Sequence, residues 1–263
     1  MVKTALVTGG SKGIGRKTVE LLALSGCNVI VNYRSDQEYA ESFVKGVETS
    51  FDVKALSILG DVSKKEDCER LSASVLQEFG RVDILVHNAG PYIHERKRMG
   101  DYSWDDWNHL INGNVTSVFY LTKLLLPSMR ENGWGRIITF GFDRVETAPA
   151  WVNRSAFAAA KTGLASLTKT LAAEEAASGV TANMVCPGDI IGSWKERSVV
   201  DAVGVDSPLV PVGRPGTGED IARVVAFLAS DESSFITGAV IPVTGGQDVL
   251  GKHLKEKARG MLH

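Results

Sequence analysis

Short apolar runs rich in β-branched residues alternate along the chain with longer segments of helical periodicity. The first three segments are an apolar run at 4–8, an amphipathic stretch at 13–26 and a second apolar run at 28–33. Further strands are expected at 54–60, 82–88, 135–141, 180–186 and 239–244, and further helices near 36–49, 64–79, 104–130, 155–178 and 219–230. Strands that alternate with helices form βαβ units, so the pattern predicts an α/β fold with a seven-stranded parallel sheet.

The predicted strands are apolar almost throughout, which is typical of a sheet covered by helices on both faces. Right-handed crossovers place the carboxyl ends of all strands along one edge, where ligands bind in doubly wound folds. At 263 residues the chain is long enough for one such domain, and it contains no linker or internal repeat. We therefore expect a single Rossmann domain over residues 1–248, followed by a basic, solvated tail at 249–263.

Composition narrows the class of protein. Apolar residues make up 44% of the chain, charged residues 23%, and the formal net charge is −2, as in an ordinary globular enzyme and unlike a nucleic-acid-binding protein. No run approaches the roughly 18 apolar residues of a membrane span, and the N-terminus lacks a signal-peptide pattern. The three cysteines are too widely spaced for a disulfide framework, and the histidines lack metal-ligand spacing. We expect a cytoplasmic protein with no metal and with neither membrane nor nucleic acid as partner.

A glycine-rich turn, TGGSKGIG, follows the first predicted strand. Its glycines are Gly9, Gly13 and Gly15, and the residues near them include Ser11, Lys12 and Ile14. Glycine lets the backbone approach a pyrophosphate closely, and the free N–H groups and positive dipole end of the following helix stabilise the phosphate charge. The strand, turn and helix together predict a dinucleotide-binding site.

The spacing of this turn, TGxxxGIG, resembles that of the short-chain dehydrogenase/reductase family. The resemblance extends over residues 3–247 and is carried by further segments: Asp61-Val62, Asn88-Ala89-Gly90, Asn114 within DDWNHLINGNVTSVF, Pro187-Gly188 and FLASDESSFITGAVIPVTGG. Within this family the chain is similar to the β-ketoacyl (3-oxoacyl) acyl-carrier-protein reductases. The resemblance implies a nicotinamide cofactor, a small-molecule or acyl-thioester carbonyl substrate and a homotetramer.

The same resemblance implies which residues bind the cofactor. It assigns the adenine to Asp61 and the nicotinamide amide to Ile190. The other cofactor contacts that it implies are Val62, Asn88, Ala89, Gly90, Lys161, Pro187 and Gly188. The substrate pocket would form from the loops at 91–104 and 188–213, which are long enough to act as lids.

The end of the second predicted strand bears on the choice of cofactor. Relatives that prefer NAD place a carboxylate there to bind the ribose hydroxyls, and that carboxylate repels a 2′-phosphate. Here the strand ends in Asn32, Tyr33 and Arg34 with no acid. Arg34, together with Lys12 in the glycine turn, can neutralise a phosphate through charge-assisted hydrogen bonds. The sequence therefore favours NADP(H) over NAD(H).

The catalytic residues of the resembled family are present only in part. Its reductases use a Ser, a Tyr-x-x-x-Lys pair at the start of a long helix, and an Asn. Asn114 and Lys161 match, whereas Phe157 stands at the Tyr position and Phe142 at the Ser position. Because a phenyl ring offers no hydroxyl donor, ordinary ketone reduction should be nearly abolished.

Three functions therefore remain open: an atypical NADP-dependent oxidoreductase, a non-catalytic NADP(H)-binding sensor or partner subunit, and a non-redox dehydratase or isomerase. An oxidoreductase would need an electrophile that requires little proton assistance, such as a quinone or an activated enone, or else a substitute acid. Asp143 and Arg144 are the preferred substitutes, with Tyr92 and Ser155 as further candidates. Ser155 is also expected to cap the helix that Gly179 ends.

Overall fold

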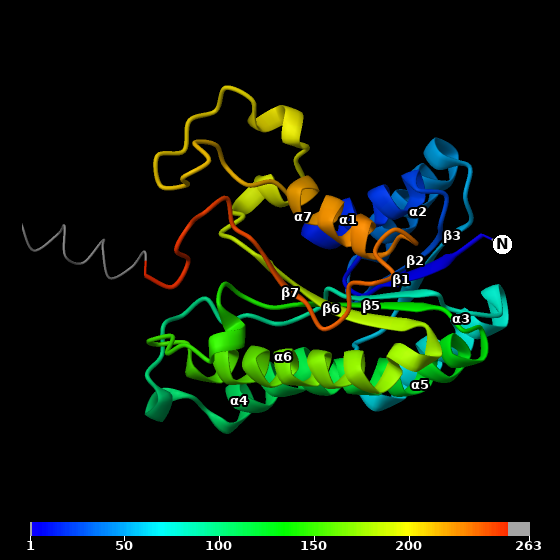
Figure 1. Cartoon of the computed structure of the whole chain (residues 1–263), viewed down its shortest axis with the longest axis horizontal. Coiled ribbons are helices and arrows are strands. Elements are labelled where there is room, and N and C mark those ends of the chain that lie inside the picture. The colour runs from blue at the N-terminus through cyan, green and yellow to red at the C-terminus, as the bar shows by residue number, and fades with distance from the viewer. Residues whose placement is uncertain (1, 252–263) are drawn as a thin grey trace, which may run out of the picture.

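The computed structural model describes residues 2–251, which form one parallel sheet between two layers of helices (Figure 1). The sheet has seven strands in the order β3-β2-β1-β4-β5-β6-β7, and every pair is parallel. This confirms the predicted seven-stranded, doubly wound Rossmann fold. The strands are β1 (Thr4–Val7), β2 (Asn28–Tyr33), β3 (Ala55–Leu59), β4 (Ile84–His87), β5 (Gly135–Phe140), β6 (Val180–Pro187) and β7 (Val240–Val243).

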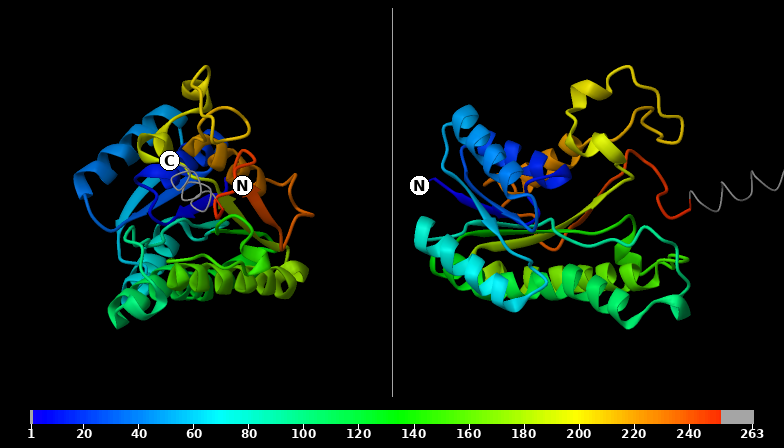
Figure 2. Two further views of the ribbon diagram at one scale, coloured as in Figure 1. Left: turned by 90° about the vertical axis from the view of Figure 1, so that its left-hand side faces the viewer. Right: turned by 180° about the vertical axis from the view of Figure 1, so that it is seen from behind.

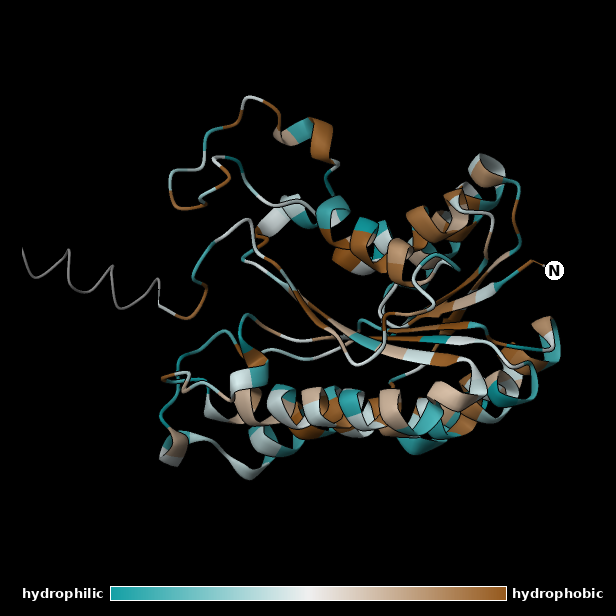
Figure 3. Ribbon diagram, viewed as in Figure 1, coloured by the Kyte–Doolittle hydropathy of each residue, from teal (hydrophilic) through white to brown (hydrophobic). Residues whose placement is uncertain are grey.

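Hydrophobic clusters on both faces of the sheet hold the helices against it. One face packs against α1 (Gly13–Leu24), α2 (Gln37–Phe51) and α7 (Gly218–Leu228), and the other packs against α3 (Lys65–Phe79), α5 (Ser117–Glu131) and α6 (Ser155–Glu175). The strands and the inner sides of these helices carry most of the hydrophobic residues (Figure 3). The segments after β6 and β7 project at the same end of the sheet as the loops after β4 and β5 (Figure 2). Long loops therefore surround the carboxyl ends of the strands, where a ligand site is expected.

The helix predicted at 104–130 is interrupted in the structure. It consists of α4 (Trp104–Ile111), a π-helical turn (Asn112–Thr116) and α5. A Cβ on Gly113 would clash with the ring of Pro91, so the turn packs tightly on the loop after β4. The wide turn directs Asn114 inward, where its Nδ2 donates hydrogen bonds to the carbonyls of Pro91 and Leu110 at 3.0 and 2.9 Å. Such π-turns interrupt helices mainly at functional sites.

The prediction that Ser155 caps α6 is wrong. Arg154 precedes the helix at the capping position, and Ser155 is its first residue, with a buried Oγ that has no hydrogen-bond partner. The guanidinium of Arg154 donates hydrogen bonds to the carbonyls of His94 and Glu95, which fixes Arg154 in place. Gly179 does end this region, because it follows a single 3-10 turn at a φ of 72° that favours glycine.

The C-terminal tail does not begin as the solvated segment that we expected. Val249 is only 6% exposed, and Leu250 packs against the core cluster that contains Phe142. The reason is an ion pair of 2.6 Å between Arg144 and Asp248, which holds the segment against the loop after β5. The rest of the predicted tail, 252–263, lies outside the described residues. No helix in the described part is long and apolar enough to cross a membrane.

Candidate active site

The glycine turn between β1 and α1 forms a tight cradle. Gly9 and Gly13 have φ values of 59° and 61°, which other residues adopt only with strain. A Cβ on Gly15 would overlap the carbonyl oxygen of Gly9 and lie 2.5 Å from Nδ2 of Asn88. That Nδ2 donates hydrogen bonds to the carbonyls of Thr8 and Gly9 at 2.9 and 3.0 Å. Asn88, predicted to contact the cofactor, therefore also joins the end of β4 to the turn.

Replacing Gly15 by alanine should destabilise the protein by about 1–3 kcal/mol, because the added methyl group forces the turn away from Asn88. The matched control is Gly46→Ala in α2, where a Cβ meets nothing within 4 Å. That change should instead add about 0.5–1 kcal/mol, because alanine favours a helix interior over glycine. Urea unfolding of the two variants measures the difference; equal stabilities would contradict the close approach.

A small cavity of about 230 Å³ lies beside this turn, over the ends of β2, β3 and β4. The predicted cofactor residues in its wall are Gly9, Arg34, Asp61, Val62, Ala89 and Gly90. Asn32 shapes the cavity, since its Nδ2 donates to the carbonyl of Gly60 at 2.9 Å. Ser11, Gly15 and Tyr33 are buried and do not line this cavity. The cavity has the position expected for the adenosine half of a dinucleotide.

The basic groups beside this cavity differ in their surroundings. Arg34 makes no ion pair with any residue between 2 and 251. Lys12, by contrast, pairs with Asp36 at 2.6 Å, and this hydrogen bond raises the pKa of Lys12 and lowers that of Asp36. Asp36 lies two residues beyond Arg34 in a left-handed backbone conformation that turns it back toward the glycine turn. Sequence reasoning considered only the strand end and missed this acid.

A larger cleft of about 1030 Å³ adjoins the cavity at Gly90 and extends over the ends of β4, β5 and β6. It brings together most of the remaining predicted residues: Lys12, Gly13, Ile14, Asn88, Phe142, Phe157, Lys161, Pro187, Gly188 and Ile190. The segments on opposite sides of the cleft are the loops after β4 and β6, as predicted for the substrate pocket. The cavity and the cleft form one continuous edge of the sheet on which a dinucleotide could lie extended.

Lys161 lies on α6 at the floor of the cleft and is 6% exposed. Burial lowers the pKa of its ammonium group to about 8. A Cβ on Gly90 would lie 2.5 Å from Asn114 Oδ1 and 3.3 Å from Lys161 Nζ, so both side chains converge on Gly90. Asn114 Oδ1 is buried and has no hydrogen-bond partner. A buried acceptor without a partner is costly unless a ligand or water completes it, which marks this corner as a binding site.

Four aromatic side chains, here called the aromatic box, line the cleft: Tyr92, Phe142, Trp151 and Phe157. The ring of Phe157 lies 4.9 Å from Tyr92, 5.9 Å from Trp151 and 6.4 Å from Phe142 between centroids. Lys161 Nζ lies 5.8 Å from the centroid of Phe157. The residues at the expected Ser and Tyr positions thus present phenyl rings to the cleft beside the buried lysine.

The substitute acids proposed from sequence are only partly in place. Asp143 and Arg144 do not line the cleft. They hold the C-terminal segment instead: Asp143 accepts a backbone hydrogen bond from Val249, and burial raises its pKa. Ser155 also lies outside the cleft, whereas Tyr92 lines it. The preference for Asp143 and Arg144 was therefore wrong, because the chain turns away from the cleft directly after Phe142.

Comparison with known proteins gives relatives of nearly equal length. Residues 9–248 match the family model described as enoyl-(acyl carrier protein) reductase. YtkK of Bacillus subtilis (strain 168), named as an oxidoreductase without a substrate, is 50% identical over 253 residues, which are 96% of this chain and 99% of that protein. The 3-oxoacyl-[acyl-carrier-protein] reductase FabG of Salmonella typhimurium is 38% identical over 245 residues, 93% of this chain and 96% of its own length.

A solved structure agrees with these matches. The protein from Bacillus thuringiensis assigned as a 3-oxoacyl-reductase superposes with a TM-score of 0.89 at 47% identity, covering 95% of this chain and 100% of that one. The chain belongs to the short-chain dehydrogenase/reductase family. The family predicted from the glycine turn is thereby confirmed. As a short-chain dehydrogenase/reductase, the chain is related to oxidoreductases that generally use a nicotinamide cofactor.

The residues of this short-chain dehydrogenase/reductase cleft that were missed from sequence include Trp151 and His94. Trp151 lies in the loop between Phe142 and Phe157, and its ring lies 4.9 Å from that of Phe142. His94 lies in the loop after β4 with its ring 5.2 Å from Tyr92. An aromatic residue between two Phe positions was the available signal for Trp151; no local pattern pointed to His94.

Proposed function

We propose that this short-chain dehydrogenase/reductase binds NADP(H) and acts as an oxidoreductase on an apolar, electron-poor carbonyl compound such as a quinone or an activated enone. The observation that carries the proposal is the buried Lys161 beside an aromatic box in which Phe142 and Phe157 offer no hydroxyl group. Bound NADP(H) would supply the hydride. The rest of the chemistry must come from the side chains of the cleft.

The residues present fit such a cofactor. The glycine cradle has no room for Cβ atoms at Gly15, and the corner at Gly90 contains the partnerless Asn114 Oδ1. The N–H of Gly13 already donates a 2.7 Å hydrogen bond to a carboxylate oxygen of Glu196, so the start of α1 can bind an anion. Arg34, beside the adenosine cavity, is the group that would bind a 2′-phosphate.

Lys161 is a buried cation that lines the cleft beside the aromatic box. Its charge would stabilise the negative charge that develops on a carbonyl oxygen during reduction, and a pKa of about 8 would allow it to hold or release a proton near neutral pH. Enones and quinones delocalise that charge, so they need less help from a donor than a simple ketone does. The flat, apolar walls of the aromatic box suit such planar acceptors.

The test of this function is NADPH consumption, followed by absorbance, with a quinone, an enoyl thioester and a 3-oxoacyl thioester. We expect turnover with the first two and little with the third. If NADPH binds but no acceptor is reduced, the proposal fails. A non-catalytic NADP(H)-binding role, which the phenyl rings of Phe142 and Phe157 at the expected donor positions also favour, then takes its place.

Replacing Arg34 by aspartate should shift the ratio of NADPH to NADH affinity by about 10- to 100-fold toward NADH. The change removes a phosphate partner and introduces a carboxylate that repels a 2′-phosphate. Titration of both cofactors measures the ratio, with Arg96→Asp as a control for the same charge reversal on an exposed residue of the loop after β4. Equal affinity of the wild type for NADPH and NADH would refute the assignment to Arg34.

A further inference from the structure

The segment at 192–202, here called the bridging segment, follows β6 in sequence and packs against both α1 and α7. It also forms part of the cleft wall. On the α7 side, the N–H of Val199 donates to the carboxylate of Glu219 at 2.7 Å. The backbone of Lys195 also packs so closely on Gly218 that a Cβ there would overlap its carbonyl oxygen. On the α1 side, Lys17 Nζ donates to Ser198 Oγ at 3.3 Å.

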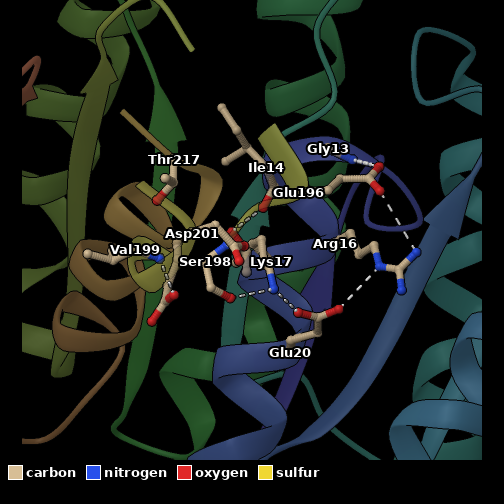
Figure 4. A network of polar contacts seen from close by, with 12 residues as sticks. Gly13, Ile14, Arg16, Lys17, Glu20, Glu196, Ser198, Val199, Asp201 and Thr217 are labelled. Carbon is tan, nitrogen blue, oxygen red and sulfur yellow. Dashed lines mark hydrogen bonds and ion pairs between the residues drawn. The ribbon is translucent and has the colours of Figure 1, made fainter. Parts of the chain in front are cut away.

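Glu196 lies at the front of the bridging segment and points its carboxylate at the start of α1 (Figure 4). One oxygen accepts the 2.7 Å hydrogen bond from the N–H of Gly13, and the other lies 3.9 Å from a guanidinium nitrogen of Arg16. α1 has no acidic residue in its first turn and no side-chain cap at Lys12. Glu196, 183 residues away in sequence, supplies the anion that this helix end favours.

We propose that Glu196 is an internal competitor for the pyrophosphate of the cofactor, and that cofactor binding acts on the substrate pocket by expelling it. This inference rests on the proposed cofactor site. A pyrophosphate at the start of α1 and the carboxylate of Glu196 would compete for the same N–H of Gly13. Two negative charges within hydrogen-bond distance of one N–H also repel each other, so Glu196 must leave when the pyrophosphate binds.

The two anchors of the bridging segment differ in what this displacement would do to them. The contacts with Glu219 and Gly218 do not involve the glycine turn, so they can persist when Glu196 leaves. The front of the segment, which includes Gly192 and Ser193 of the cleft wall, then loses the contact with α1 that Glu196 provides. The state of the cofactor site is thereby transmitted to the substrate side of the same cleft.

Binding titrations separate this contact from a general charge effect. We would titrate NADPH and adenosine 2′-monophosphate, which has no pyrophosphate, into the wild type, Glu196→Gln, Glu196→Asp and the control Glu78→Gln on exposed α3. Both Glu196 variants should bind NADPH about two- to tenfold more tightly, because glutamine lacks the charge and aspartate is too short to reach Gly13. Their affinity for adenosine 2′-monophosphate and all affinities of Glu78→Gln should equal those of the wild type.

Unchanged NADPH affinity in Glu196→Gln would overturn the inference while leaving the cofactor site intact. Wild-type affinity in Glu196→Asp with tighter binding in Glu196→Gln would also overturn it, because charge alone would then explain the effect. Failure of every protein to bind NADPH would instead refute the proposed function.

Limited trypsin digestion gives an independent readout, since Lys195 and Arg197 flank Glu196 and are exposed. NADPH should accelerate cleavage after these residues in the wild type, and Glu196→Gln should be cleaved at the faster rate without NADPH. A cleavage rate that is the same with and without saturating NADPH in the wild type would overturn the release of the segment.

Discussion

Replacing Lys161 by alanine is expected to lower kcat/KM for NADPH-dependent reduction by about 10²–10³-fold, the usual effect of removing a group that stabilises developing negative charge. Lys161 is the one cation buried on the cleft floor among the described residues, and Asn114 and Gly90 fix its position. Phe142 and Phe157, which stand at two of the expected donor positions of the cleft, offer no hydroxyl group to compensate for the lost ammonium group. The measurement is steady-state turnover with the best acceptor from the panel above.

The matched control for this change is Lys169→Ala, which removes an exposed lysine two turns further along α6 and should leave turnover unchanged. Thermal unfolding shows whether either variant is less stable. A Lys161→Ala protein that is folded and turns over at the wild-type rate would remove Lys161 from the chemistry and favour Tyr92, the substitute donor from sequence that lines the cleft.

The pH profile of the wild type tests the same role. Burial lowers the pKa of Lys161 to about 8, so the group is charged below this pH and neutral above it. If the ammonium form assists the reaction, turnover should be greatest below pH 8 and fall as the pH rises through that value. Lys161→Arg should keep its charge throughout and abolish this fall, even if its larger head group lowers the rate.

The fold was predictable from sequence because its strands and helices follow from local patterns, namely short apolar runs that alternate with segments of helical periodicity. The second strand was predicted at 28–33 and is observed as Asn28–Tyr33, and all seven strands lie where the pattern placed them. The break in the predicted helix at 104–130 was not predictable in the same way. It depends on contact between Gly113 and Pro91, which are distant in sequence, while the local residues have ordinary helical character.

In the candidate site, too, residues in local motifs were predictable, whereas residues placed by long-range loop contacts were not. The glycine turn, Asn88, Asn114 and Lys161 follow motifs of fixed spacing, and the structure places them at the cavity and the cleft. The carboxylates of Glu196 and Asp36, which contact Gly13 and Lys12 of the glycine turn, were missed. Each reaches the glycine turn only because a loop folds back: the segment after β6 for Glu196, and a left-handed residue after β2 for Asp36. No spacing rule encodes contacts that a loop conformation creates.

Restoring the two hydroxyl groups should change the acceptor that the cleft can use. We expect the double variant Phe142→Ser with Phe157→Tyr to reduce a 3-oxoacyl thioester about 10²–10⁴-fold faster than the wild type, as for a restored general acid. Lys161 Nζ already lies 5.8 Å from the Phe157 centroid, and a cation at this range lowers the pKa of a phenol and favours proton transfer.

The two substitutions should not contribute independently. Phe142 is 3% exposed and its ring lies 4.9 Å from that of Trp151, so it fills the space beside Phe157 that a carbonyl oxygen would need. Phe157→Tyr alone should therefore gain little, whereas Phe142→Ser alone opens the space but supplies no phenol. Steady-state rates of both single variants and the double variant form a cycle that measures this coupling.

Stability must be measured beside the rates, because removing the buried Phe142 ring should cost about 3–5 kcal/mol. Phe157→Tyr is the safer change, since Phe157 is half-buried at the cleft and its new hydroxyl can meet solvent. A folded double variant with no gain on the thioester would show that the loop between Phe142 and Phe157, which carries Trp151, and not the missing hydroxyls, excludes simple ketones. A gain confined to the double variant would show that the aromatic box alone separates this cleft from an ordinary ketone reductase.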